Sequence, residues 1–187
     1  LLPILTLAQQ LPTPPALAAK SWLLIESGSG QELASQAADD RLEPASLTKL
    51  LTAYLTFSAL KQGTIKLDQM IVVSEKAWKA EGSRMFIQVG TQVAVEDLIK
   101  GMIVQSGNDA CVALAELIAG SEESFAQMMN KEAQRLGMKA SSFRNAAGLL
   151  DPQHYTTARD LATLTGALIR DFPEDYSKYY SIKEFTY

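Results

Sequence analysis

The sequence has little cysteine and little histidine, with one residue of each among 187. Cys111 has no second cysteine for an internal disulfide, and Cys111 and His154 are too few for a zinc-binding cluster. A disulfide scaffold and a structural zinc site are therefore excluded, and a Ser-His-Asp triad would have to use His154. Positive charge is also scarce, because 17 Lys and Arg stand against 21 Asp and Glu. We expect no nucleic-acid partner for so acidic a chain.

The sequence also lacks the run of about 20 apolar residues that a membrane-spanning helix needs. Residues 1–8 are apolar and are followed by Gln9 and Gln10, without a positively charged segment before them. We interpret this stretch as the remnant of a secretory signal peptide, with an ordinary apolar N-terminal segment as the alternative. Residues 11–15 read Leu-Pro-Thr-Pro-Pro, a linker that cannot continue a helix. The folded part is therefore expected over residues 19–187, after a remnant and linker over residues 1–18.

Between these ends, the spacing of apolar residues predicts two short strands followed mostly by helices. Strands over residues 22–26 and 32–34 flank a Gly-Ser-Gly turn, as in a β-hairpin. Residues 44–60 are apolar on nearly every side, which indicates a buried central helix. Thr157 is expected to cap a helix that ends at Pro173. The other expected elements are strands at 71–73 and 85–87, helices at 95–105, 110–119 and 122–136, and a strand-like tail at 182–187.

The first chemical signal is the segment Pro44-Ala45-Ser46-Leu47-Thr48-Lys49. Proline suits the first position of a helix, which puts Ser46 in the first turn and Lys49 one turn later on the same face. The helix dipole and backbone N–H groups there favour an oxyanion, and the dipole and apolar flank disfavour a charged amine. Lys49 is therefore a candidate base for the Ser46 proton. Ser-x-x-Lys also arises about once by chance in such a chain, so a helix-start serine and a snorkelling lysine are the alternative.

The same spacing recurs at Ser58 and Lys61, near the end of the same expected helix. In the last turn the dipole stabilises a charged lysine, and no free backbone N–H points toward a substrate. We interpret this second pair as a C-terminal cap and not as a site.

The second chemical signal is Ser106-Gly107-Asn108, at the break between two apolar helices. Polar side chains at such a corner are supported on both sides by packed structure, which makes a rigid site. The alternative is structural: Asn108 or Asp109 caps the helix that begins at Ala110, and Gly107 makes the turn.

The two signals occur in the order of a known signature, Ser-x-x-Lys, then Ser-Asp-Asn, then Lys-Thr-Gly, of class A β-lactamases and penicillin-binding proteins. The chain resembles the low-molecular-mass penicillin-binding proteins that are serine-type D-alanyl-D-alanine carboxypeptidases, and Ser-Gly-Asn favours these over β-lactamases. The resemblance implies an α/β fold of the penicillin-binding protein type, with an antiparallel sheet, a helical region and a groove between them. It runs from about Lys20 to Tyr187, and its further matching segments are 39–52, 82–86, 89–90, 105–113, 148–149 and 155–160.

The resemblance also implies an activity, namely hydrolysis of the terminal D-Ala-D-Ala bond of the peptidoglycan stem pentapeptide, with β-lactams acylating the same serine. Ser46 would be the nucleophile and Lys49 its general base. Ser106 would relay a proton to the leaving group. Asn108 would hold the substrate amide or the Lys49 side chain, and Ser83 would contact the substrate. No metal or organic cofactor is expected.

One part of the signature is missing, because the sequence holds no Lys-Thr-Gly. The nearest string, at residues 164–166, lacks the lysine and lies in an expected helix. We expect residues 19–187 to be an incomplete catalytic domain without its C-terminal strands, and acylation of this chain to be slow or absent. By resemblance, the protein lies outside the cytoplasmic membrane, in the periplasm or at a Gram-positive surface. A C-terminal segment outside this chain would attach it to the inner membrane.

Three alternatives stay open from the sequence. The first is a D,D-endopeptidase that cuts cross-links, which no motif separates from a carboxypeptidase. The second is a serine β-lactamase, which in class A needs a glutamate for deacylation. The third is a truncated member that binds cell-wall peptide without turning it over. Cys111 is expected to be a small buried side chain and His154 a loop residue.

Overall fold

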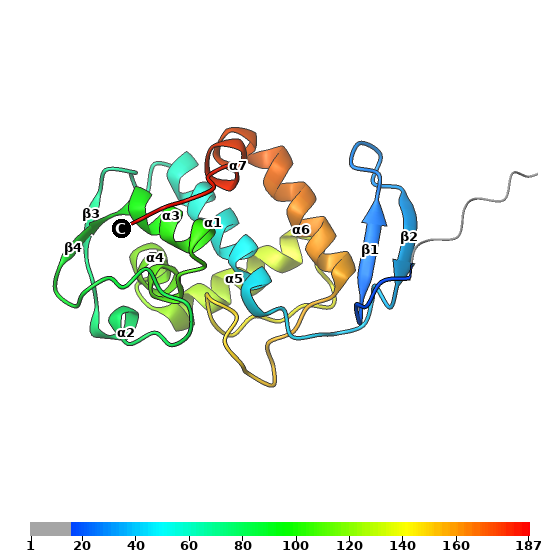
Figure 1. Cartoon of the computed structure of the whole chain (residues 1–187), viewed down its shortest axis with the longest axis horizontal. Coiled ribbons are helices and arrows are strands. Elements are labelled where there is room, and N and C mark those ends of the chain that lie inside the picture. Colours follow the sequence, from blue (N-terminus) through cyan, green and yellow to red (C-terminus); the bar gives the residue numbers. More distant parts are fainter. Residues whose placement is uncertain (1–15) are drawn as a thin grey trace, which may run out of the picture.

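The computed structural model describes residues 16–187 (Figure 1). Residues 1–15, which contain most of the expected signal-peptide remnant and linker, lie outside the described residues. A bundle of helices forms the body, and two small antiparallel sheets lie at its opposite ends. The elements are β1 (Trp22–Ile25), β2 (Glu32–Gln36), the 3-10 turn η1 (Ala45–Thr48), α1 (Lys49–Lys61), β3 (Met70–Val72), α2 (Glu75–Trp78), β4 (Gln92–Ala94), α3 (Val95–Val104), α4 (Asn108–Ala119), α5 (Glu122–Leu136), α6 (Ala158–Asp171) and α7 (Pro173–Tyr180).

The central helix α1 holds the body together, as its apolar sequence predicted. It contacts α3, α4, α5 and α6, so apolar residues on every side of it are buried. Phe57 is fully buried and stacks on Tyr179 of α7, with ring centroids 5.8 Å apart. Tyr54 meets Phe172 edge to face at 4.9 Å. Aromatic pairs of this kind add about 0.5–1.5 kcal/mol beyond the burial of their area, so they fix the C-terminal helices on α1.

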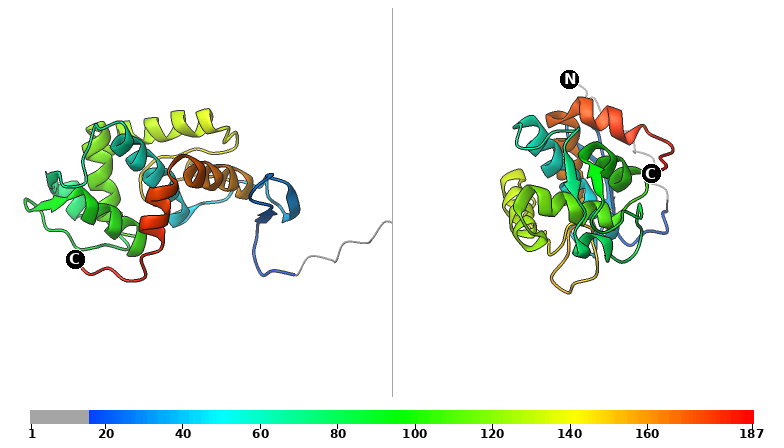
Figure 2. Two further views of the ribbon diagram at one scale, coloured as in Figure 1. Left: turned by 90° about the horizontal axis from the view of Figure 1, so that it is seen from above. Right: turned by 90° about the vertical axis from the view of Figure 1, so that its left-hand side faces the viewer.

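The predicted hairpin is confirmed, and it lies apart from the body at one end of the molecule (Figure 2). Trp22 pairs with Gln36 and Leu24 with Ala34. The Glu26 carboxylate closes the turn by accepting hydrogen bonds from the backbone N–H groups of Gly28 and Ser29. The turn therefore has its own polar closure, independent of the helices.

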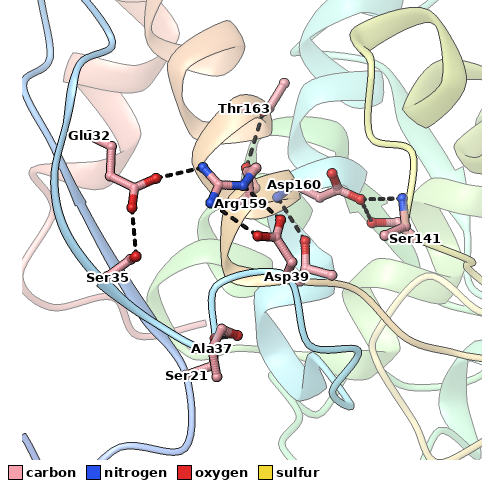
Figure 3. Close-up of polar contacts among 11 residues, drawn as sticks. Ser21, Glu32, Ser35, Ala37, Asp39, Ser141, Arg159, Asp160 and Thr163 are labelled. Atoms are coloured by element: carbon pink, nitrogen blue, oxygen red, sulfur yellow. Dashed lines mark hydrogen bonds and ion pairs between the residues drawn. The ribbon is translucent and has the colours of Figure 1, made fainter.

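Arg159, near the start of α6, attaches the hairpin to the body (Figure 3). Its Nη1 donates to Glu32 on β2 at 2.8 Å, and its Nε donates to Asp39 at 2.7 Å. Behind it, Thr157 accepts from the backbone N–H of Asp160, which confirms the predicted helix cap. The Asp160 carboxylate in turn accepts from the Ser141 hydroxyl at 2.6 Å. The N-terminal end of α6 thus binds both the hairpin and the segment that precedes α6.

The strand predicted at residues 85–87 is wrong. The backbone N–H groups of Met85, Phe86 and Ile87 all donate to the carboxylate of Asp109, which is fully buried at the start of α4. Phe86 has a φ of +65°, outside the β region, so these groups cannot join a ladder. The strand at residues 70–72 pairs instead with β4, which the sequence analysis did not identify.

The C-terminal predictions are partly wrong as well. Pro173 follows the end of α6, as expected, but it also begins α7 at the first helical position, where its missing N–H costs nothing. Residues 182–187 form no strand, although their alternating pattern predicted one. Gln105 donates to the carbonyl of Phe185, so this segment lies against the end of α3. Figure 1 and the left-hand view of Figure 2 show it running toward the end that carries β3 and β4.

Helices α3, α4 and α5 agree with the sequence prediction to within two residues. Gly120 and Gly137 close α4 and α5 with φ of +79° and +87°, a left-handed conformation that glycine adopts without strain. Over residues 16–187, no helix is both long and apolar enough to cross a membrane. In the same range, His, Cys, Asp and Glu side chains form no group of three suited to a metal ion.

Candidate active site

Ser46 lies at the surface, in a 3-10 turn and not in the first turn of the α-helix itself. The turn η1 runs directly into α1, so the expected helix start is tighter than predicted. Ala45 has a φ of +47°, which is unusual for a residue with a side chain. Gly148 packs against this turn so closely that a Cβ there would lie 1.8 Å from the Ala45 carbonyl oxygen. The backbone around Ser46 is thus fixed from both sides.

Lys49 lies at the base of the site with only 7% of its surface exposed. Its Nζ is 3.0 Å from Ser46 Oγ, and it donates to the carbonyl of Ala147 at 3.0 Å. Burial lowers the pKa of Lys49 below its ordinary value, because the charged amine is the form that loses most by leaving water. A nearby buried thiol, Cys111, acts in the opposite direction and is the smaller effect. The geometry and the lowered pKa together suit an amine that takes up a proton from Ser46.

Ser106 completes a group of three at the break between α3 and α4. Its Oγ donates to Ser46 Oγ at 3.0 Å, across 60 residues of sequence. The φ of Ser106 is +56°, and such strain at a non-glycine residue persists where the surrounding structure fixes it. The backbone N–H of Gly107 donates to the Gly101 carbonyl and fixes this corner on α3. Ser46 Oγ therefore lies within hydrogen-bond distance of both Lys49 and Ser106.

Asn108 lies next to this group but does not contact Lys49. Its Nδ2 donates to the Glu81 carbonyl at 2.6 Å, and its backbone N–H donates to the Ser83 carbonyl at 2.7 Å. A Cβ at Gly82 would lie 2.8 Å from Asn108 Nδ2, so the fit is tight. The alternative role as a cap is also wrong, because Asn108 is the first residue of α4 and the capping residue before it is Gly107. Asn108 thus fastens residues 81–83 to the site, and the exposed Ser83 is part of that segment.

A groove opens in front of the three residues. It has a volume of about 350 Å³ and is lined mainly by apolar atoms. Ser46 and Ser106 line it together with Met102 of α3 and Tyr180 at the end of α7. A groove of this size holds a short peptide end or a small ring compound, with the Ser46 hydroxyl facing it.

His154 does not serve Ser46. Its Nδ1 accepts from the Arg144 backbone N–H at 3.2 Å, so Nε2 carries the proton and donates to Thr48 Oγ1 at 2.9 Å. The ring is 3% exposed, and burial lowers the pKa of His154. His154 is in a loop, as predicted, but it supports the turn η1 from behind, and no Ser-His pair forms with Ser46.

The sequence analysis missed the roles of two further groups near the site. Asp109, which it considered only as a helix cap, binds the 85–87 segment. Asn145 is the other, and the Asn-x-x-Gly spacing to Gly148 is a turn signal that could have found it. Cys111 is fully buried, as predicted, and burial raises its pKa to about 12, so it is not a reactive thiol.

Solved structures of penicillin-binding proteins are similar in fold to this chain. Penicillin binding protein 5 from Haemophilus influenzae matches with a TM-score of 0.91 and 45% identity, over 94% of this chain and 52% of that one. Penicillin binding protein 6B from Escherichia coli gives 0.88 and 41%, over 94% and 57%. A mutant of the Streptomyces K15 DD-transpeptidase gives 0.77 and 28%, over 84% and 63%. The chain therefore has the α/β fold of penicillin-binding proteins and transpeptidases, as the sequence predicted.

Sequence comparison then gives the family. Residues 8–187 match peptidase family S11, D-alanyl-D-alanine carboxypeptidase, and the chain belongs to this family. D-alanyl-D-alanine carboxypeptidase DacC of Escherichia coli K12 is 46% identical over 186 residues, which cover 96% of this chain and 46% of that protein. DacA of Haemophilus influenzae is 46% identical over 178 residues, which cover 94% and 45%. The chain spans about half the length of these relatives, 46% and 45%.

Proposed function

We propose that the protein is a serine-type D-Ala-D-Ala carboxypeptidase, which removes the terminal D-alanine from peptidoglycan stem pentapeptides through an acyl-enzyme. The observation that carries the proposal is the line from Lys49 Nζ through Ser46 Oγ to Ser106 Oγ, with 3.0 Å at each step. A nucleophile with a base on one side and a second hydroxyl on the other is the arrangement that acyl transfer needs. Family membership supports the same activity.

In the proposed reaction, Ser46 Oγ attacks the carbonyl carbon of the D-Ala-D-Ala bond while Lys49 takes up the hydroxyl proton. The tetrahedral oxyanion is stabilised by the backbone N–H of Ser46 at the start of the helix. The proton passes through Ser106 to the leaving amine, the C–N bond breaks, and D-alanine departs. Water then attacks the ester, Lys49 accepts its proton, and Ser46 recovers its hydroxyl as the shortened peptide leaves.

Asn108 and Ser83 are proposed to contact the peptide. The carboxamide nitrogen of Asn108 donates to the Glu81 carbonyl. The carboxamide oxygen of Asn108 is therefore the atom that we propose accepts a hydrogen bond from a substrate amide N–H. Ser83 is exposed and its backbone is held by Asn108, so its hydroxyl lies on a supported edge. No metal or organic cofactor takes part in the proposed steps.

We also propose that β-lactams acylate Ser46, because they present a strained amide to the same nucleophile. Stem peptides lie outside the cytoplasmic membrane, so the protein would act there, in the periplasm. We propose that this chain is part of a longer protein, called the natural-length protein below, which a C-terminal segment attaches to the inner membrane. Within the 187 residues, the part over 19–187 is proposed to be an incomplete catalytic domain, because its sequence holds no Lys-Thr-Gly.

The proposal is tested by intact mass after incubation with benzylpenicillin, for this chain and for the protein at its natural length. The natural-length protein is expected to gain one penicilloyl group, and Ser46→Ala is expected to gain none. Ser58→Ala is the matched control, since Ser58 and Lys61 have the same spacing at the other end of α1 and should label normally.

A natural-length protein that folds but gains no mass would overturn the proposal. A penicilloyl group that is released within seconds would indicate a β-lactamase. With acylation established, release of D-alanine from a pentapeptide identifies a carboxypeptidase, and cleavage of cross-linked dimers alone identifies an endopeptidase.

A further inference from the structure

The main-chain partner of Lys49 belongs to a turn that a single side chain organises. Asn145 Oδ1 accepts hydrogen bonds from the backbone N–H groups of Ala147 at 3.2 Å, Gly148 at 2.7 Å and Leu149 at 3.0 Å. Its Nδ2 donates to the Leu149 carbonyl at 3.0 Å. One carboxamide therefore satisfies four groups of a five-residue turn, more than the Asx turns that asparagine ordinarily forms.

This turn, residues 145–149, lies against both η1, which carries Ser46, and α1, which carries Lys49. The Ala146 carbonyl accepts from Thr52 Oγ1 at 2.7 Å, and the Ala146 N–H donates to the buried carboxylate of Glu122 at 3.1 Å. Gly148 touches the Ala45 carbonyl at the other end of the turn. The turn is thus fixed to α1, η1 and α5, and its shape sets where the Ala147 carbonyl points.

That direction matters for proton transfer. A neutral amine has two N–H bonds and one lone pair, arranged tetrahedrally. When the Ala147 carbonyl accepts one N–H, rotation of the Lys49 amine is limited and its lone pair can face Ser46 Oγ, 3.0 Å away. A base must be held in reach of the proton it removes, and small displacements at that step are costly.

We propose that Asn145 is a positioning residue for Lys49: its carboxamide folds the 145–149 turn so that the Ala147 carbonyl orients the amine toward Ser46. Asn145 acts through the turn and does not touch the reacting atoms. The inference rests on the proposed function, since it assigns Asn145 a part in that reaction.

The chain offers a matched control, a second asparagine that binds the segment between α5 and α6. Asn130 of α5 donates to the Phe143 carbonyl at 2.7 Å and accepts from the Phe143 N–H at 2.9 Å, so it also fastens the stretch between α5 and α6 by its carboxamide. It does so near Phe143, at a point of the segment that does not bind Lys49. Asn130→Ala therefore reports the cost of losing such a fastening without the effect on the amine.

The experiment measures the second-order rate constant for labelling by a fluorescent penicillin between pH 6 and 10, with the thermal melting of each variant, in the natural-length protein. Asn145→Ala is expected to label on the order of 10- to 100-fold more slowly, the range for a displaced catalytic group. Asn130→Ala is expected to melt earlier by a similar amount but to label within about two-fold of the wild type.

Asn145→Asp is the second variant, and it remains informative if Asn145→Ala does not fold. Its carboxylate still accepts from the three N–H groups, so the turn is expected to form and most of the rate to return at high pH. The added negative charge near Lys49 favours the ammonium form, so the pH profile is expected to move to higher pH. This shift follows from the added charge whatever role Asn145 has, so the discriminating result is the rate: recovery at high pH in Asn145→Asp, beside a slow Asn145→Ala, indicates that the accepted hydrogen bonds position the amine.

The outcomes separate the two proposals. Wild-type labelling that Ser46→Ala abolishes supports the function, and equal slowing of Asn145→Ala and Asn130→Ala then overturns the inference alone. An Asn145→Asp variant that folds but labels as slowly as Asn145→Ala at high pH also overturns the inference. If the wild type itself is not labelled, both proposals fall.

Discussion

Backbone strain gathers at the residues that surround Ser46. Ala45 and Ser106 have φ of +47° and +56°, a region that costs residues with side chains roughly 1–2 kcal/mol each. Such conformations persist where packing fixes them and where the geometry they give is needed. Here they aim the Ser46 and Ser106 hydroxyls at each other, 3.0 Å apart. The fold itself therefore fixes the relative positions of these two hydroxyl groups.

At the same scale, the burial of His154 predicts how the stability of the fold depends on pH. Its pKa is lowered in the folded protein by burial, with Asp151 and Arg144 as the facing charged groups. In the unfolded chain His154 binds a proton at about pH 6.5, whereas in the folded protein it does so only at lower pH. The contribution of neutral His154 to the free energy of unfolding is therefore present above about pH 6.5 and is lost as the pH falls below it.

The measurement is the melting temperature of the wild type and of His154→Gln between pH 7.5 and 5. The wild type is expected to lose more stability over this range than the variant, by a slope that corresponds to about one proton at most. His154 is the only histidine of the sequence, so the difference has no other histidine source. Equal slopes would contradict the prediction.

At the scale of the element, Asp109 decides the conformation of a whole segment. It is fully buried, and the three N–H groups of residues 85–87 are its partners. Asp109→Ala leaves the buried N–H groups of Met85 and Ile87 without this partner, and unfolding by denaturant is expected to show a loss of about 3 kcal/mol. Asp109→Asn keeps one acceptor oxygen and should lose less. Equal stability of both variants would show that the N–H groups find other partners.

The helices α1, α3, α4, α5 and α6 and the hairpin could be predicted because their signals are local, whereas α2 and α7 were missed. Periodicity, the Gly-Ser-Gly turn and the Thr157 cap each act within a few residues of one another. The 85–87 segment has the composition of a strand, but its partner Asp109 is more than 20 residues away, at separations of 24, 23 and 22. Pro173 is ambiguous by itself, because proline follows one helix as readily as it begins the next.

The candidate site divides in the same way. Ser46 and Lys49 are one turn apart, so their contact follows from spacing, and the resemblance to a family added Ser106. The Asn-x-x-Gly spacing indicates a turn at Asn145, but the contact between that turn and Lys49 spans 98 residues and no spacing rule predicts it. The hydrogen bond between His154 and Thr48, across 106 residues, could not be predicted for the same reason. Their roles, like those of Ser46 and Lys49, stay predictions until the variants are measured.

At the scale of the whole molecule, the hairpin is joined to the helices largely by exposed charge. Arg159 binds Glu32 and Asp39, and all three side chains are partly exposed to water. Arg159→Ala is expected to speed amide exchange over residues 22–36 and to change the stability of the helical body by less than about 1 kcal/mol. Hydrogen exchange read by mass spectrometry makes the comparison.

Arg170→Ala is the control, because Arg170 pairs with its neighbour Asp171 at the far end of α6 and does not reach the hairpin. Its hairpin amides should exchange as in the wild type. Unchanged exchange in Arg159→Ala would mean that the remaining contacts between β1 and α6 are enough to hold the hairpin.

Gly148 has a consequence for any survey of tolerated substitutions. A Cβ there would overlap the Ala45 carbonyl, which is main chain and cannot move aside without moving Ser46. In a scan that replaces each position by all other amino acids, residue 148 would be as intolerant as Ser46, the proposed nucleophile, although it carries no functional group. A method that ranks positions by their tolerance alone would then predict a catalytic role for residue 148. Its actual role is the absence of a side chain, which lets the 145–149 turn approach the backbone of Ala45.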